Sequence, residues 1–153
     1  MENLKSVIGE HPFMQGLDEH TLDTLVGCAS NVRYNAGDYL ARMGQPAEHF
    51  FIIRHGHVSL EINAGPRGII GVHTVEAGDV LGWSWLIEPY KWHFDARAVE
   101  LTRVIALNGE CLRKKCEQDH DLGYALMKRV AQLMEQRLTA TRMQLLDMYG
   151  THV

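Results

Sequence analysis

The sequence lacks the features that several broad classes of protein require. Its 15 lysines and arginines are outnumbered by 19 acidic residues, which gives a formal net charge of −4 over 153 residues. A protein that binds nucleic acid directly needs a dense basic footprint, so we expect no nucleic-acid binding. No apolar run reaches the length of a membrane span, and the start, MENLKSVIGEHPF, lacks a signal-peptide pattern. We therefore expect a cytoplasmic protein without membrane contact.

Cysteines and catalytic motifs are also scarce. The three cysteines, Cys28, Cys111 and Cys116, include no CxxC pair, so we expect free, reduced thiols. A four-cysteine iron–sulfur cluster is excluded unless subunits share ligands, whereas an axial haem ligand from a histidine or cysteine stays open. The nine histidines form no HExxH motif, and we expect them to be solvated turn residues without a metal. With no GxSxG, P-loop or GxGxxG motif, we expect no enzyme and no cofactor.

The centre of the chain is rich in short β-prone runs. Eight such runs alternate with glycine-containing turns at a spacing of about ten residues. This pattern predicts an eight-stranded antiparallel β-roll and a fold that is mainly β with flanking helices. Its length favours a single domain. The expected parts are N-terminal helices in 1–31, the roll in 32–107 and C-terminal helices in 108–150, within one domain covering 1–153.

Helical patterns flank this region on both sides. Asp18 is placed to cap a short amphipathic helix, and Asn108 to cap a helix that runs to about Glu117. Asp119 or Asp121 then begins a second helix that continues to about Met148, a length of about 28 residues or roughly 40 Å. A helix longer than its own domain needs a partner for its apolar side.

The apolar residues of this long helix fall on two sides. One side has coiled-coil spacing, so we expect it to form a homodimer seam. The seam consists of Met127, Val130, Met134, Leu138, Thr141, Leu145 and Met148. The alternative is a helix that lies wholly on its own domain. The other side, which is suited to packing on the roll, contains Leu122, Leu126 and Leu133.

The order of helix, roll, short helix and long helix resembles the cyclic nucleotide-binding domain superfamily. The glycine positions in AGDYLARMGQPAEHFFIIRHGHVSL and EAGDVLG carry the resemblance, which covers about residues 12–149. It implies the effector-domain fold of catabolite activator and Fnr-like proteins. It also implies a phosphate-binding cassette at 78–98, in which a glycine, a glutamate, a short helix and an arginine hold the cyclic phosphate and ribose.

In this sequence the cassette is degenerate at its polar positions. The cassette glycine matches Gly82, but the glutamate position holds Trp83 and the arginine position holds Trp92. Without these two anchors we expect ordinary cyclic AMP and cyclic GMP binding to be lost or weakened by orders of magnitude. The candidate pocket residues are Gly82, Trp83, Ser84, Trp85, Leu86, Trp92, His93 and Arg97.

Two questions about the cassette stay open at this point. Arg97 could replace the missing arginine if the connection to the last strand shortened, which would preserve cyclic nucleotide binding. The three tryptophans, Trp83, Trp85 and Trp92, either fill the pocket or form an aromatic cage for an apolar or planar ligand.

The expected function is that of a non-catalytic regulatory or sensory module. Because only Thr-His-Val follows the long helix in this sequence, we expect no DNA-reading recognition helix. We expect the module to act as a homodimer or by contacting an unknown protein partner or small-molecule ligand. The alternatives are a genuine cyclic nucleotide-binding protein that uses Arg97, and an interaction protein whose pocket is closed.

Overall fold

The computed structural model describes residues 3–150, and eight strands form two antiparallel sheets. The strands are β1 (Ala29–Tyr34), β2 (Tyr39–Ala41), β3 (His49–His55), β4 (His57–Asn63), β5 (Ile69–Glu76), β6 (Val80–Leu81), β7 (Asp95–Ala98) and β8 (Thr102–Asn108). One sheet has the order β1-β8-β3-β6 and the other β2-β7-β4-β5. The predicted eight-stranded roll is therefore confirmed, with the first strand beginning at Ala29, where it pairs with Leu107.

The helices lie before and after the roll, apart from the short turn η2 (Gly65–Arg67) between β4 and β5. They are α1 (Leu4–Glu10), the single turn η1 (Pro12–Met14), α2 (Glu19–Val26), η2, α3 (Gly109–Gln118) and α4 (His120–Gly150). The predicted caps are present: side-chain oxygens of Asp18, Asn108 and Asp119 accept backbone N–H groups at 2.8, 2.8 and 3.2 Å. Each satisfies a donor that the first helical turn would otherwise leave free.

Two apolar clusters form the core, and β3 contributes to both. Phe51 and Ile53 point into the roll, between the two sheets. Phe50 and Ile52 point to the opposite face and pack against the helices. Successive side chains of a strand alternate between faces, so a strand that is buried on both faces joins the two clusters. We call these the roll cluster and the helical cluster.

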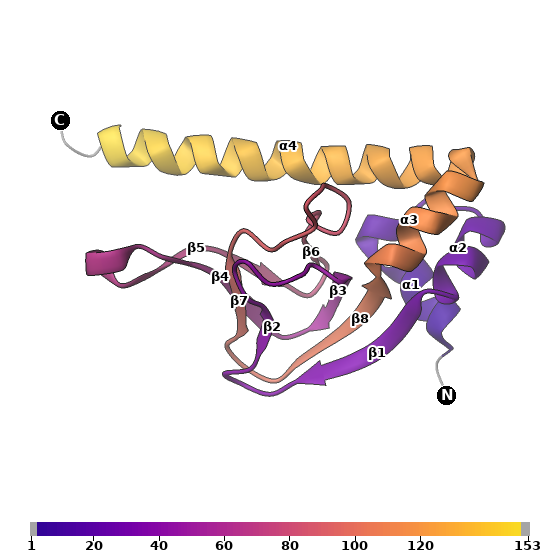
Figure 1. The fold of residues 1–153 in the computed structure, drawn as a ribbon, viewed down its shortest axis with the longest axis horizontal. Helices are drawn as coiled ribbons and strands as arrows, with labels where there is room; N and C mark the ends of the chain where they lie inside the picture. The colour runs from indigo at the N-terminus through magenta and orange to yellow at the C-terminus, as the bar shows by residue number, and fades with distance from the viewer. Residues whose placement is uncertain (1–2, 151–153) are drawn as a thin grey trace.

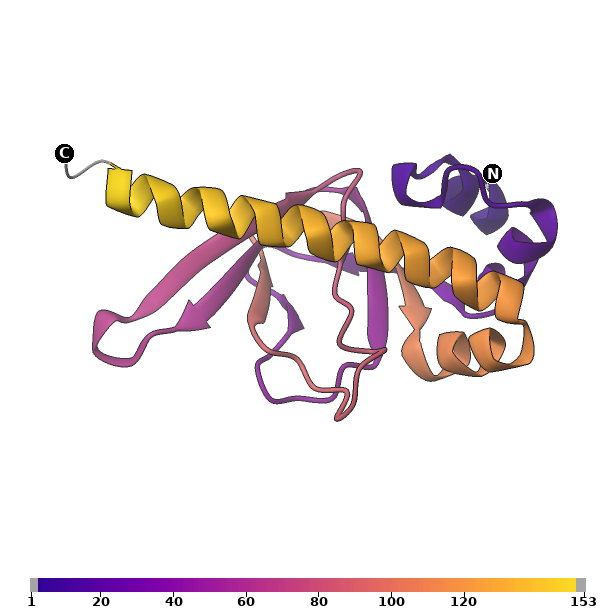
Figure 2. The same cartoon turned by 90° about the horizontal axis from the view of Figure 1, so that it is seen from above.

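The long helix α4 runs along one side of the roll (Figures 1 and 2). Its first half packs on its own domain through Leu122, Leu126 and Leu133, as one side of the helix predicted. Farther along, Arg137 donates to the Val80 carbonyl oxygen at 3.0 Å, and no residue after it is buried up to Gly150. The helix therefore begins as part of the core and ends as an exposed rod.

The expectation that all three cysteines are free is wrong for two of them. Cys28 and Cys111 form a disulfide, and only Cys116 is a free thiol. The two bonded residues are 83 positions apart, and the fold brings them together where β1 pairs with β8 beside the start of α3. No spacing motif encodes that meeting, so the sequence alone did not reveal it.

Two expectations from the sequence concern membrane spans and the end of the chain. No helix within residues 3–150 is long and apolar enough to cross a membrane. The sequence after Gly150, on which the expected lack of a recognition helix depends, consists of residues 151–153 and lies outside the described residues.

Candidate functional site

The expected cassette begins at Gly82, directly after β6. Gly82 has a φ of +92°, a conformation that favours glycine. The expected short helix after it is absent: residues 83–86 form one turn, in which the Leu86 N–H donates to the Trp83 carbonyl oxygen at 3.0 Å. A single turn does not align several N–H groups and dipoles as a helix N-terminus does. The local backbone therefore lacks the helix that would face an anion.

The indole ring of Trp92 covers Gly82. A Cβ placed on Gly82 would lie 2.6 and 2.7 Å from two ring carbons of Trp92, closer than real Cβ contacts. Trp92 is 4% exposed and belongs to the roll cluster, where its ring stacks on Phe51 with centroids 6.2 Å apart. Phe94 packs against the same cluster, with its ring centroid 5.7 Å from that of Trp92. The position expected for the phosphate arginine thus holds a buried apolar ring.

Backbone hydrogen bonds fix Trp92 in this place. Its N–H donates to the Gln45 carbonyl oxygen at 3.0 Å, and its own carbonyl oxygen accepts from Gly44 N–H at 2.8 Å. The neighbouring Lys91 forms a bridge to Pro46, and its side chain is exposed, as is that of His93. Neither of these two polar residues is part of the buried surface around Gly82.

The other two tryptophans lie in a different part of the core. Trp85 is fully buried in the helical cluster, with its ring centroid 5.7 Å from that of Phe50, and Trp83 and Leu86 pack against the same cluster. Trp92 belongs to the roll cluster. A single aromatic cage would require the three rings to face one space, and this division between two clusters argues against it.

Sequence reasoning missed Arg113, which holds the cassette loop on α3. Its Nη1 donates to the Trp85 carbonyl oxygen at 2.5 Å, and its guanidinium carbon lies 4.0 Å from the centre of the Tyr90 ring. Cation–π contact and a charge-assisted hydrogen bond both favour this arrangement. An arginine on an amphipathic helix has no local signal for this contact, which only the tertiary fold creates.

Arg97 is engaged on the outer side of the roll. Ala96 and Ala98, its neighbours in β7, are fully buried in the roll cluster, so Arg97 points to the opposite face. There its Nε and Nη2 donate to the two carboxylate oxygens of Glu61 at 3.2 and 2.9 Å. These hydrogen bonds lower the pKa of Glu61 despite its burial. A phosphate at Gly82 would have to pull Arg97 away from this bidentate partner and through the sheet.

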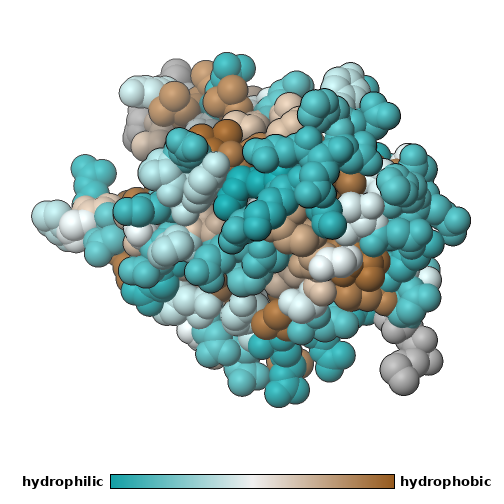
Figure 3. Space-filling model, turned by 45° about the vertical axis from the view of Figure 1, so that its right-hand side comes forward, coloured by the Kyte–Doolittle hydropathy of each residue, from teal (hydrophilic) through white to brown (hydrophobic). Residues whose placement is uncertain are grey.

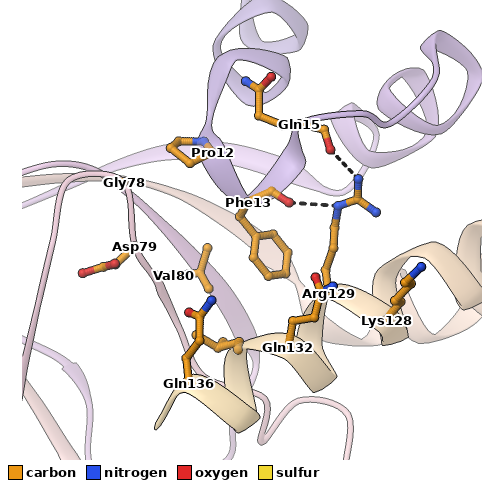
Figure 4. A pocket seen from close by; sticks show the side chains of 11 residues that line it. Pro12, Phe13, Gln15, Gly78, Asp79, Val80, Lys128, Arg129, Gln132 and Gln136 are labelled. Carbon is orange, nitrogen blue, oxygen red and sulfur yellow. Dashed lines mark hydrogen bonds between the residues drawn. The ribbon is translucent and has the colours of Figure 1, made fainter. Parts of the chain in front are cut away.

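A separate cavity of about 450 Å³ lies between η1, the β5–β6 turn and α4 (Figure 4). Arg129 spans one wall of it and donates to the carbonyl oxygens of Phe13, at 3.0 Å, and Gln15. Its guanidinium therefore serves to attach α4 to the N-terminal segment. Of the expected cassette at 78–98, only Gly78, Asp79 and Val80 line this cavity.

The first two residues of the predicted seam on α4 pack on the domain, and the later ones do not. Val130 is 2% exposed and lies in the helical cluster, and Met127 packs against it. Val130 is therefore not open to a partner, and Met127 is only partly exposed. The other members of the seam, Met134, Leu138, Thr141, Leu145 and Met148, are exposed. In Figure 3, hydrophobic side chains gather at the upper left over the end of α4.

Comparison with known proteins agrees with this architecture. Residues 31–119 match the family described as "Cyclic nucleotide-binding domain". The chain therefore belongs to the cyclic nucleotide-binding domain family. Cyclic nucleotide-gated ion channel 18 of Arabidopsis thaliana is 32% identical over 88 residues, which are 55% of this chain and 12% of the channel. The match thus spans about an eighth of the length of that relative.

Solved structures show the same fold. A cyclic nucleotide-binding domain from Methylobacillus flagellatus superposes with a TM-score of 0.83 at 18% identity, covering 94% of this chain and 83% of the other. A Geobacter metallireducens protein superposes with a TM-score of 0.80 at 26% identity, covering 90% and 99%. The roll, the N-terminal helices and the long final helix are thus shared features of the fold.

Proposed function

We propose that this chain is a non-catalytic regulatory module that does not bind cyclic AMP or cyclic GMP in the usual way. The observation that carries the proposal is the buried Trp92 ring on Gly82. The ring occupies the surface against which a cyclic phosphate would be held. A cyclic nucleotide would have to displace a ring that packs on Phe51 and is anchored through its own backbone.

Charge supports the same conclusion. The buried polar residues within 3–150 include no lysine or arginine: they are His11, Thr21, Glu61, Ser84 and Thr102. A buried phosphate without a cationic partner loses about 2 kcal/mol or more in charge-assisted hydrogen bonding. Since about 1.4 kcal/mol corresponds to a tenfold change in affinity, the missing arginine alone weakens binding by more than an order of magnitude.

The exposed end of α4 is the surface through which we expect the module to associate. Met134, Leu138, Leu145 and Met148 are between 41% and 66% exposed, and they continue the coiled-coil spacing of the seam. Apolar residues at this spacing stabilise a helix pair by mutual burial. We propose that this face pairs with a second copy of the chain, and that the shortened seam begins at Met134.

Equilibrium dialysis with cyclic AMP and cyclic GMP tests the pocket. We expect no retention above background at millimolar nucleotide, in both the wild type and an Arg97→Ala variant. Saturable retention by the wild type would contradict the proposal. Loss of that retention in Arg97→Ala would establish the alternative that uses this arginine.

Analytical ultracentrifugation tests the helix pair. We expect a dimer for the wild type and a folded monomer for Leu138→Glu with Leu145→Glu, because both positions lie on the seam and are exposed within the protomer. The matched control is Leu146→Glu, the same substitution at a leucine that is 61% exposed and outside the seam, which should leave the dimer intact. A wild-type monomer at high concentration would refute the seam.

A further inference from the structure

The disulfide joins two segments that are also held together by backbone contacts. Cys28 lies between α2 and β1, Cys111 lies in the first turn of α3, and their Cα atoms are 5.7 Å apart. The Asn108 N–H donates to the Cys28 carbonyl oxygen at 2.9 Å, and Ala29 pairs with Leu107. These contacts do not depend on the sulfur–sulfur bond, so the two thiols would stay close to each other after reduction.

The two sulfur-bearing residues differ in access. Cys28 is 7% exposed and packs in the helical cluster. Cys111 is only partly buried, and it lines a shallow hollow of about 370 Å³ on α3. The hollow is lined by Asn108, Glu110, Cys111, Lys114, Lys115 and Gln118. A small thiol in solution can therefore approach Cys111 but not Cys28.

One of the two lysines that line the hollow forms no ion pair with a carboxylate of residues 3–150. Lys114 pairs with Glu110 at 3.2 Å. Lys115 forms no ion pair within residues 3–150, and it lines the same hollow. Lys115 is partly exposed, and its ammonium group favours an anionic molecule at this place by a modest amount in water. Cys111 also stands at a helix N-terminus, where a thiolate is stabilised.

We infer that Cys111 is a thiol-exchange site for an anionic low-molecular-weight thiol of the glutathione class. A thiolate of that class attacks Cys111 Sγ, the bond to Cys28 breaks, and its electron pair goes to Cys28 Sγ, which takes a proton from water. The product is a mixed disulfide at Cys111. A second thiolate attacks the small-molecule sulfur, forms the free disulfide and releases the Cys111 thiolate.

The remaining cysteine provides an internal comparison. Burial raises the pKa of Cys116, and the negative charges of Asp119 and Glu117 add to this effect. Its thiol is therefore less often ionised, and it does not line the hollow beside Lys115. Since the thiolate is the reacting form, Cys116 should exchange more slowly than Cys111.

Trapping the mixed disulfide tests the site. The reduced Cys28→Ser variant, incubated with glutathione disulfide, should gain one glutathionyl group, located at Cys111 by peptide mass spectrometry. Reduced Cys111→Ser should gain no glutathionyl group at the buried Cys28. Reduced Cys116→Ser should give the same products with glutathione disulfide as the reduced wild type. Circular dichroism of each reduced variant confirms that it is folded. A folded Cys28→Ser protein with no adduct, or with its adduct on Cys116, would overturn the inference.

A charge reversal tests the class of thiol. Lys115→Glu in the Cys28→Ser background should slow reaction with anionic glutathione disulfide by about threefold, and should not slow reaction with the cationic disulfide cystamine. The control Lys128→Glu reverses a charge on α4, away from the hollow. Equal effects on both reagents, or no effect on either, would overturn the assignment of an anionic thiol.

Discussion

The contact between Gly82 and Trp92 can be measured with a double-mutant cycle. Gly82→Ala places a methyl group 2.6 and 2.7 Å from two ring carbons, where about 3.4 Å or more is normal. Overpacking of this kind costs about 1–3 kcal/mol, and the left-handed backbone adds about 1–2 kcal/mol. We therefore expect Gly82→Ala to lower the free energy of unfolding by about 3 kcal/mol.

Removing the ring should relieve most of this penalty. Trp92→Leu lacks the two ring carbons and by itself costs about 2–3 kcal/mol through lost packing. In that background Gly82→Ala retains only the backbone strain, so the cycle should give a coupling of about 2 kcal/mol. The assay is urea unfolding of the wild type, both single variants and the double variant.

Gly78→Ala is the matched control for this cycle. Gly78 has a similar φ of +96°, but a Cβ there meets only Pro12, at an ordinary 3.8 Å. Its cost of about 1–2 kcal/mol should be the same with Trp92 or with leucine. Additive effects of Gly82→Ala and Trp92→Leu would refute the contact between the ring and the glycine.

Three other predictions follow from single contacts. Arg113→Ala should lower the free energy of unfolding by about 2 kcal/mol, measured by urea unfolding, and speed limited proteolysis of the 83–91 loop. Arg113→Lys should have a smaller effect in both assays, because it keeps part of the hydrogen bond to the Trp85 carbonyl oxygen but not the stacking on the Tyr90 ring. Reduction of the disulfide, which closes a loop of 83 residues, should lower the free energy of unfolding by up to about 4.5 kcal/mol, measured by urea unfolding with and without reductant; no change would contradict a native bond. Hydrogen bonds to Glu100 and, less strongly, to Glu76 raise the pKa of His57. Protonated His57 should therefore stabilise the fold relative to His57→Gln fully below about pH 6.5, and this stabilisation should disappear as the pH rises through the raised pKa. Urea unfolding midpoints of the two proteins, measured from below about pH 6.5 upward, test this.

Much of the fold is encoded in local patterns that the sequence displays. Alternating β-prone runs and glycine turns predicted the strands, and Asp18, Asn108 and Asp119 predicted helix starts, because a cap depends on residues only three positions away. The long helix was predicted for the same reason. Each of these features is decided by the nearest neighbours in the chain.

The parts that could not be predicted depend on contacts between distant segments. The division of the tryptophans between two clusters depends on which face of the fold each ring meets, and the loop after Gly82 gives no periodic pattern. The pairing of Cys28 with Cys111 depends on β1 meeting β8. The sequence also predicts Val130 as a seam residue, whereas it is buried in the helical cluster, because coiled-coil spacing does not reveal which turns of a helix its own domain already covers.

Thermal unfolding with added cyclic AMP or cyclic GMP tests most directly our proposal that the cassette does not bind cyclic nucleotides. A ligand that binds only the folded state stabilises it by about 2.7 kcal/mol at a hundred times its dissociation constant, which gives a clear upward shift of the midpoint. We predict no shift for the wild type at millimolar nucleotide, because Trp92 covers Gly82 and no lysine or arginine among residues 3–150 is buried. A saturable upward shift with either nucleotide would contradict this prediction.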